Sequence, residues 1–180
     1  MNKQEEDPSA KIEQFLKHIL LTLDTDFVTS SQRYQNNPQA FQASILPQLN
    51  PQSAVIINGQ PFGERAVFQS LWANLPASQH TLLSFDTHLI PAIQPVYVIN
   101  AHLKVRFDES GRTRLGDSSE KEGIMPPQPA TATRPIWGPW FGVDLNLAVD
   151  SKVNQSFDGE LISTWNWRTT SKSEGSAYSI

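Results

Sequence analysis

The sequence of 180 residues contains no cysteine. This absence excludes disulfides, zinc sites with cysteine ligands, iron–sulfur clusters and thiol catalysis, and it fits a reducing compartment. Charge is also scarce, because Asp, Glu, Lys and Arg make up 18% of the chain against roughly 25% in ordinary soluble domains. The formal net charge of -4 disfavours a globally basic nucleic-acid binder.

Long apolar runs are missing as well. The longest uninterrupted apolar run of the first predicted helix is Ile19-Leu20-Leu21, far short of the roughly 20 residues that cross a bilayer. The polar, acidic N-terminus does not resemble a secretory signal. We therefore expect a protein without membrane insertion. It would have a flexible tail over residues 1–8, one domain over residues 9–170 and a C-terminal tail over residues 171–180.

Apolar residues in the first part of the chain recur with helical spacing. Asp7-Pro8 is a predicted helix start, because Asp7 can cap free N–H groups and a proline at the first helical position needs no partner. The apolar stripe that follows predicts a helix of about five turns. Its members are Ile12, Phe15, Leu16, Ile19, Leu20, Leu23 and Phe27. Two more helices are expected over Pro38–Leu46 and Phe62–Leu75, with a short strand over Ala54–Ile57 that ends at Asn58-Gly59.

After residue 78 the pattern changes to the alternation of strands. Strands are predicted over His80–Ile90, Val96–Asp108, Trp137–Asp150 and Phe157–Thr170. Helices that precede such a sheet indicate an α+β fold, with one sheet face on the helices and the other face polar. The loop over residues 109–135 is long and rich in proline, so it is either functional or disordered.

The alternation places few titratable side chains in the core. It assigns His80, Asp86 and His88 to the outer sheet face, as a solvated surface or, alternatively, a metal or acid–base cluster. The core positions are Leu83, Phe85, Thr87, Leu89, Leu161, Ser163, Trp165, Trp167 and the odd-numbered residues of 97–107 and 141–149. None of them is Asp, Glu, His or Lys, which an enzyme pocket between helices and sheet would need. We expect no catalytic residues, no metal and no cofactor.

The opposite sheet face carries polar side chains, and it is either solvated or a partner interface. Its residues are Asn100, His102, Lys104, Arg106, Asp144, Asn146, Asn166 and Arg168. In the loop that follows, Arg112, Arg114 and Lys121 can contact RNA phosphate only if the fold separates them from nearby acidic residues. Trp137 and Trp140 are either a corner of the core, the default for aromatic side chains, or an exposed anchor.

Three segments resemble the small subunit of the fungal messenger-RNA export receptor. They are Lys104–Arg112, Arg134–Gly142 and Ala66–Trp72, and the likeness extends over most of the chain. The resemblance implies a nuclear transport factor 2-like fold, in which a curved antiparallel sheet packs on N-terminal helices.

The resemblance also implies a function. Such a subunit is a non-enzymatic adaptor that heterodimerises with the large mRNA export receptor subunit, sheet against sheet. The pair binds phenylalanine–glycine repeat nucleoporins and carries mRNA ribonucleoprotein, and large ribosomal subunits, through nuclear pores. It would be found in the nucleus and at the pore and would shuttle to the cytoplasm. The eight polar sheet residues become the expected partner interface, and Arg112, Arg114 and Lys121 become candidate RNA or ribosome contacts.

Two other functions stay open on the sequence. One is an enzyme of the same fold, of the isomerase or dehydratase type, with a pocket between helices and sheet. The other is a module that binds RNA directly, which would show tight binding with a steep dependence on salt.

Overall fold

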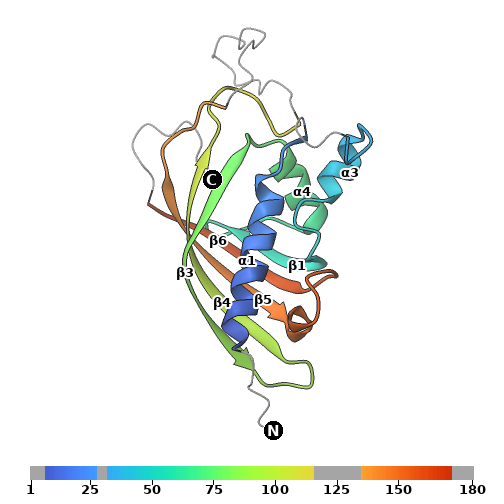
Figure 1. The fold of residues 1–180 in the computed structure, drawn as a ribbon, viewed down its shortest axis with the longest axis vertical. Coiled ribbons are helices and arrows are strands. Elements are labelled where there is room, and N and C mark those ends of the chain that lie inside the picture. Colours follow the sequence, from blue (N-terminus) through green and yellow to red (C-terminus); the bar gives the residue numbers. More distant parts are fainter. Residues whose placement is uncertain (1–6, 28–31, 116–134, 172–180) are drawn as a thin grey trace.

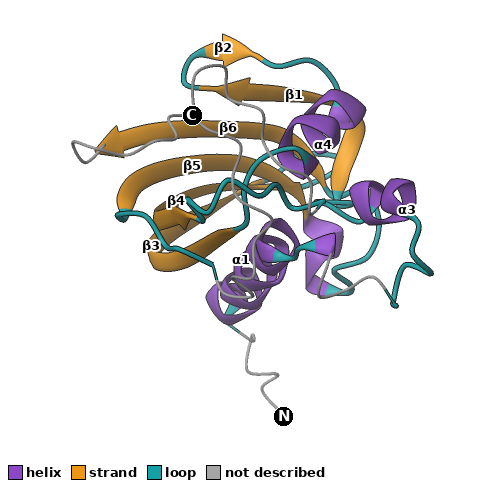
Figure 2. Cartoon of the chain, turned by 90° about the horizontal axis from the view of Figure 1, so that it is seen from above, coloured by secondary structure: helices purple, strands orange, loops and turns teal. Residues whose placement is uncertain are grey.

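The computed structural model describes residues 7–27, 32–115 and 135–171. Six strands form one curved sheet in the order β2-β1-β6-β5-β4-β3, and the helices lie on one side of it (Figure 1, Figure 2). The helical elements are α1 (Pro8–Asp24), α3 (Pro38–Ala43), α4 (Arg65–Ala73) and the 3-10 helix η1 (Ser151–Asn154). The strands are β1 (Leu49–Ile57), β2 (Gln60–Pro61), β3 (Ser78–Ile90), β4 (Val96–Phe107), β5 (Phe141–Asp150) and β6 (Ile162–Ser171). The expected α+β architecture is confirmed.

Helix α1 begins where the sequence predicts it. The Asp7 side chain accepts a hydrogen bond from the Ser9 backbone N–H at 3.0 Å, and Pro8 opens the first turn. Helix α4 starts later than expected, at Arg65, because Gly63 has a φ of 77° that interrupts the helical path. Within the described residues, no helix is long and apolar enough to cross a membrane.

Strand β1 is longer than predicted, and one of its two pairings differs from the others in the sheet. It turns into β2 through Asn58 and Gly59, whose φ angles of 49° and 79° suit a two-residue hairpin turn. Its other neighbour, β6, runs parallel to it. The expectation of a purely antiparallel sheet is therefore wrong at this pair. A register shift between Leu49 and Ala54 accommodates Pro51, which has no N–H for the ladder.

The core lies between the helices and the inner sheet face, which is the face turned toward α1. Strands β4 and β5 bury every second residue, as the sequence predicts. Trp165 and Trp167 of β6 and Trp72 of α4 are almost completely buried there. These three indole rings fill the space between α4 and the sheet, where Trp72 lies 5.6 Å from Trp167, measured between ring centroids.

Strand β3 contains a β-bulge that the sequence pattern does not reveal. Leu82 pairs with Leu103, but the next pair is Ser84 with His102, so Leu83 is an extra residue without a partner. Residues before Leu83 are therefore shifted by one position relative to the predicted alternation. Leu83 itself is 60% exposed rather than buried. A second register shift, in β6, places Ile162 in the core and leaves Ser163 exposed.

Candidate partner interface

The eight polar residues predicted to share a sheet face do share it. This outer face is turned away from α1. Across it, Asn100, Asn146 and Asn166 lie side by side on β4, β5 and β6. The neighbouring row consists of His102, Asp144 and Arg168. Lys104 and Arg106 continue along β4, so the predicted grouping is confirmed as a shared face, while its use as an interface stays a prediction.

A chain of side-chain amides crosses the middle of the outer face. Asn146 Nδ2 donates to Asn100 Oδ1 at 2.6 Å, and Asn100 Nδ2 donates to Asp86 Oδ1 at 3.2 Å. These contacts form because residues directly opposite one another on neighbouring strands have close Cβ atoms. The row therefore satisfies much of its own hydrogen bonding, which explains how this face can meet water in the free chain.

The next row carries mixed charge. His102 Nδ1 lies 2.5 Å from Asp144 Oδ1, and the two side chains are 54% and 39% exposed. Arg168 stands opposite Asp144 on β6. Together with Asn100 and Asn146, these residues line a shallow depression of about 340 Å³. Alternating charge of this kind favours one register of a partner surface over others.

A cation–aromatic cluster, formed by Lys104, Arg106, Trp137 and Trp140, occupies one end of the outer face. The Arg106 guanidinium lies 4.9 Å from the Trp137 ring centroid and 4.6 Å from that of Trp140. The Lys104 ammonium lies 4.7 Å from the Trp140 centroid. Among the described residues, neither cation has an acidic partner. Both tryptophans are half-buried and lie outside the core cluster, so the default placement of these rings in the core is wrong.

Both tryptophans follow the loop over residues 109–135, and the backbone there is fixed to the end of β4. The Glu109 N–H donates to the Ile136 carbonyl at 2.7 Å, and the Gly138 N–H donates to the Phe107 carbonyl at 2.9 Å. Asp108 adds a side-chain contact, accepting the Ile136 N–H at 2.9 Å. The exit of the loop is thereby held against its entry, which places Trp137 and Trp140 over the outer face.

Arg114 does not lie on the surface, and its prediction as an RNA or ribosome contact is wrong. The whole residue is buried, with 0% exposure. Its Nε donates to the Leu23 carbonyl at 3.0 Å, and its Nη1 donates to the Trp72 carbonyl at 3.1 Å. Its Nη2 also contacts the Ser78 hydroxyl. Arg114 thus joins the C-terminal ends of α1 and α4, where carbonyls lack intrahelical partners and carry partial negative charge.

The surroundings of Arg114 keep it charged. Burial lowers the pKa of its guanidinium to about 9, while the carboxylates of Asp24 and Asp26 oppose that fall. Since this pKa stays above 7, the side chain is a cation at neutral pH. The guanidinium also lies 5.0 Å from the centroid of Trp72.

His80 also faces inward, contrary to the predicted outer placement, because the bulge at Leu83 lies between it and the rest of β3. Its side chain is 0% exposed, and its Nδ1 lies 2.5 Å from Asp24 Oδ1. The rings of Trp72 and Trp167 enclose it, with centroids at 5.9 and 5.6 Å. The argument that the core faces lack titratable groups is therefore wrong. The pair joins α1 to β3; the imidazole is enclosed, while the Asp24 side chain stays 19% exposed.

The remaining loop candidates differ in position. Arg112 is partly exposed at the beginning of the loop. Lys121 lies outside the described residues. The sequence pattern does not predict that Arg114 is buried. The one residue that points to a buried position there is its aliphatic neighbour Leu115, which packs against the core.

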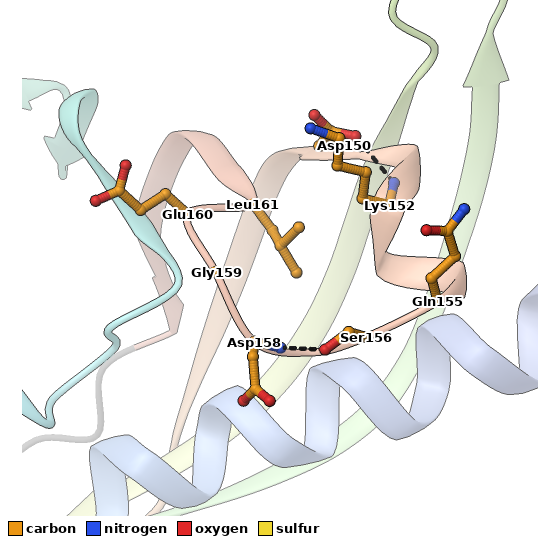
Figure 3. A pocket seen from close by; sticks show the side chains of 8 residues that line it. All are labelled: Asp150, Lys152, Gln155, Ser156, Asp158, Gly159, Glu160 and Leu161. Carbon is orange, nitrogen blue, oxygen red and sulfur yellow. Dashed lines mark hydrogen bonds between the residues drawn. The ribbon is translucent and has the colours of Figure 1, made fainter.

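An acidic depression of about 450 Å³ lies near η1 and carries no site (Figure 3). The carboxylates of Asp150, Asp158 and Glu160 point in different directions there. Asp150 accepts the Lys152 N–H at 2.9 Å, and Glu160 pairs with Arg65 at 3.4 Å. In the part of the chain that the structure describes, no group of three or more His, Cys, Asp or Glu side chains is placed to hold a metal ion.

Known proteins resemble this chain in sequence and in structure. The mRNA transport regulator MTR2 of Candida albicans is 39% identical over 175 residues, which cover 92% of this chain and 93% of that protein. The crystal structure of the C. albicans Mtr2–Mex67 M domain complex contains a chain that superposes with a TM-score of 0.78 at 37% identity, covering 94% of this chain and 99% of the other.

The fold itself is shared more widely. A putative scytalone dehydratase from Novosphingobium aromaticivorans has a TM-score of 0.53 at 12% identity, covering 96% of this chain and 88% of the other. A likeness this distant shows the fold alone. The expected fold, a curved sheet packed on N-terminal helices, is confirmed by the superposition on the C. albicans Mtr2 chain. The family model described as nuclear pore RNA shuttling protein Mtr2 matches residues 2–180. The chain therefore belongs to the Mtr2 family.

Proposed function

We propose that this chain is the small subunit of an mRNA export receptor and pairs through its outer sheet face with the M domain of a Mex67-type large subunit. The observation that carries the proposal is the cation–aromatic cluster beside two aligned polar rows, on the face turned away from the described helices. Tryptophan and arginine are enriched among residues that dominate binding energy. The solved complex of the related Mtr2 with a Mex67 M domain supports the identity of the partner.

In this proposal the heterodimer is the carrier. It brings mRNA ribonucleoprotein through nuclear pores and contacts phenylalanine–glycine repeat nucleoporins, so the chain works in the nucleus and at the pore and shuttles to the cytoplasm. The family description, which names RNA shuttling at the nuclear pore, supports this role. The net charge of -4 agrees with it, because the chain then has no need to bind RNA strongly by itself.

Large ribosomal subunits are a second proposed cargo. Arg112 and Lys121 are the proposed contacts in the loop over residues 109–135, and Arg112 is partly exposed where the loop begins. Arg114 is not part of this set because it is buried.

We also infer that the chain is not an enzyme. The shared fold with a putative dehydratase leaves that alternative possible in principle. The inward-facing titratable pair is His80 with Asp24, and the His80 side chain is completely enclosed. Its ring is held between two tryptophans, which supports a structural role over a catalytic one.

Charge reversal on the outer face tests the partner assignment. The variant Arg106→Glu/Arg168→Glu should raise the Kd for the M domain by tenfold or more, because Arg106 loses both tryptophan contacts and its bond to Gln79. The matched control is Lys17→Glu/Lys152→Glu, which makes the same change in net charge away from this face. Isothermal titration calorimetry gives both constants. Equal affinity of the two double variants would show that the chosen face is wrong.

A further inference from the structure

The hairpin between β3 and β4 exposes more aliphatic surface than a solvated turn requires. Leu89 is 52% exposed, Ile90 is 49% exposed and Ile93, near the tip, is 103% exposed. Single exposed aliphatic side chains are common on soluble proteins, but a group of them in one projecting element marks a contact surface. The hairpin forms one end of the sheet (Figure 1).

This apolar surface continues onto the outer sheet face. Ile90 stands opposite Val96, and Val98 stands between His88 and Ala148. Val96, Val98 and Ala148 are only partly buried, so they remain available for contact. The next position along β4 is the amide row that begins at Asn100. The expectation of a uniformly polar outer face is therefore wrong at this end.

The two parts of the face have different capacities to bind. Asn100 and Asn146 of the amide row already form hydrogen bonds within the free chain, so a partner gains little by replacing those bonds. Apolar area that leaves water gives a favourable free energy roughly in proportion to its size. Interfaces accordingly combine an apolar part that supplies affinity with polar parts that set register.

We propose that the β3–β4 hairpin, with Ile90, Ile93, Val96 and Val98, is the apolar anchor of the heterodimer and packs against aliphatic or aromatic side chains of the large subunit's M domain. The inference rests on the proposed function, because it assigns a further part of the same interface. The hairpin is continuous with the polar rows on one sheet face, so the partner that covers those rows, the M domain, is also the partner expected at the hairpin. An anionic membrane surface does not fit, because residues 89–100 include no lysine or arginine.

The absence of cysteine permits a direct test of contact. In the variant Ile93→Cys the new thiol is the only one in the chain, and Leu21→Cys provides a matched control on α1, where Leu21 is 68% exposed. Each full-length variant is treated with a maleimide alone and with saturating Mex67 M domain from the same organism. The alkylation rate at position 93 should fall at least tenfold in the complex, and the rate at position 21 should stay within twofold. An unchanged rate at position 93 in the saturated complex overturns the proposal.

Affinity separates this inference from the proposed function. Ile93→Asp should raise the Kd for the M domain at least tenfold, while Leu21→Asp should leave it within twofold and neither should lower the thermal unfolding midpoint appreciably. If the wild-type chain binds and Ile93→Asp binds equally well, the anchor is wrong and the pairing stands. If the wild-type chain fails to bind the M domain, the proposed function itself fails.

A phenylalanine–glycine repeat peptide tests another assignment of the hairpin. If Ile93→Asp loses binding to this peptide but keeps its affinity for the M domain, the hairpin binds nucleoporins instead, and the anchor proposal is wrong.

Discussion

At the scale of single residues, Arg114 shows how a surface residue type can be a core residue. Its guanidinium binds carbonyls at the ends of two helices and stacks on Trp72, which no aliphatic side chain can do. The partners lie 91 and 42 residues away in the sequence. No local sequence pattern can indicate contacts at that separation. The stretch around Arg114 mixes basic and acidic residues, which is a pattern typical of a solvated loop.

Replacing this arginine should destabilise the fold strongly. Arg114→Met keeps an unbranched apolar stem but removes the guanidinium, its hydrogen bonds to the Leu23 and Trp72 carbonyls and its attraction to Asp24. We expect a loss of about 3–5 kcal/mol in the free energy of unfolding. Arg168→Met, at an exposed position, should change it by less than about 0.5 kcal/mol. Urea unfolding monitored by tryptophan fluorescence measures both. Identical midpoints for Arg114→Met and the wild type would contradict this role.

The pH dependence of that loss follows from the pKa of Arg114. Its pKa in the folded chain is lowered to about 9, so the folded and unfolded chains are equally protonated at this group near neutrality. The difference between wild type and Arg114→Met should therefore be constant from pH 6 to 8. Above about pH 9 the unfolded chain holds the proton that the folded chain begins to release, so this group then makes stability rise with pH.

At the scale of elements, the sequence predicts the helices and strands whose apolar residues repeat at regular spacing. Helix α1 and strands β4 and β5 were predictable because their apolar positions repeat without interruption. The predicted faces of β3 are wrong on the N-terminal side of Leu83, because of the bulge there. On each side of a bulge the residues still alternate, but those before it point to the opposite face from the one that the pattern predicts. The exposed aliphatic surface of the hairpin at residues 90–96 is not evident from the sequence for a related reason. Prolines at 91 and 95 indicate a turn, and turn residues are normally read as solvent-facing.

The loop over residues 109–135 should be separable from the fold. Its entry is fixed by Arg114, and its exit is fixed by the backbone hydrogen bond from the Glu109 N–H to the Ile136 carbonyl. Replacing residues 116–132 with a short Gly-Ser linker should leave the thermal transition cooperative and the M domain affinity within twofold. Association with large ribosomal subunits, measured by co-sedimentation, should fall. A broadened or lost thermal transition would show that the segment supports the fold.

At the scale of the whole molecule, the two sheet faces have separate tasks. The inner face closes a core that holds three tryptophans and the enclosed His80 ring, which is joined to Asp24 of α1. The outer face has three parts in sequence along β4, namely the apolar hairpin, the polar rows and the cation–aromatic cluster. That order gives a partner one preferred orientation, because each end offers different chemistry.

The free chain should be a poor RNA binder. Its net charge is -4, and the two cations of the cation–aromatic cluster are reserved for the partner in the proposed pairing. In a gel shift with single-stranded RNA at physiological salt, we expect a Kd on the order of 10 µM or weaker. Lys104→Gln/Arg106→Gln should change it little. Nanomolar binding with a steep dependence on salt would instead support direct RNA recognition.

The bulge at Leu83 has a consequence for the subunit before it meets any partner. Strand β3, which is 13 residues long, forms an edge of the sheet in the part of the chain that the structure describes. About every second residue directs its N–H and C=O groups away from β4, where no described strand pairs with them. A long, flat edge of this kind templates pairing with strands of other molecules and leads to aggregation. The extra residue bends and twists β3 near its middle, so another strand cannot match its hydrogen bonds along the full length. We therefore expect the irregularity to disfavour edge-to-edge association of the free chain.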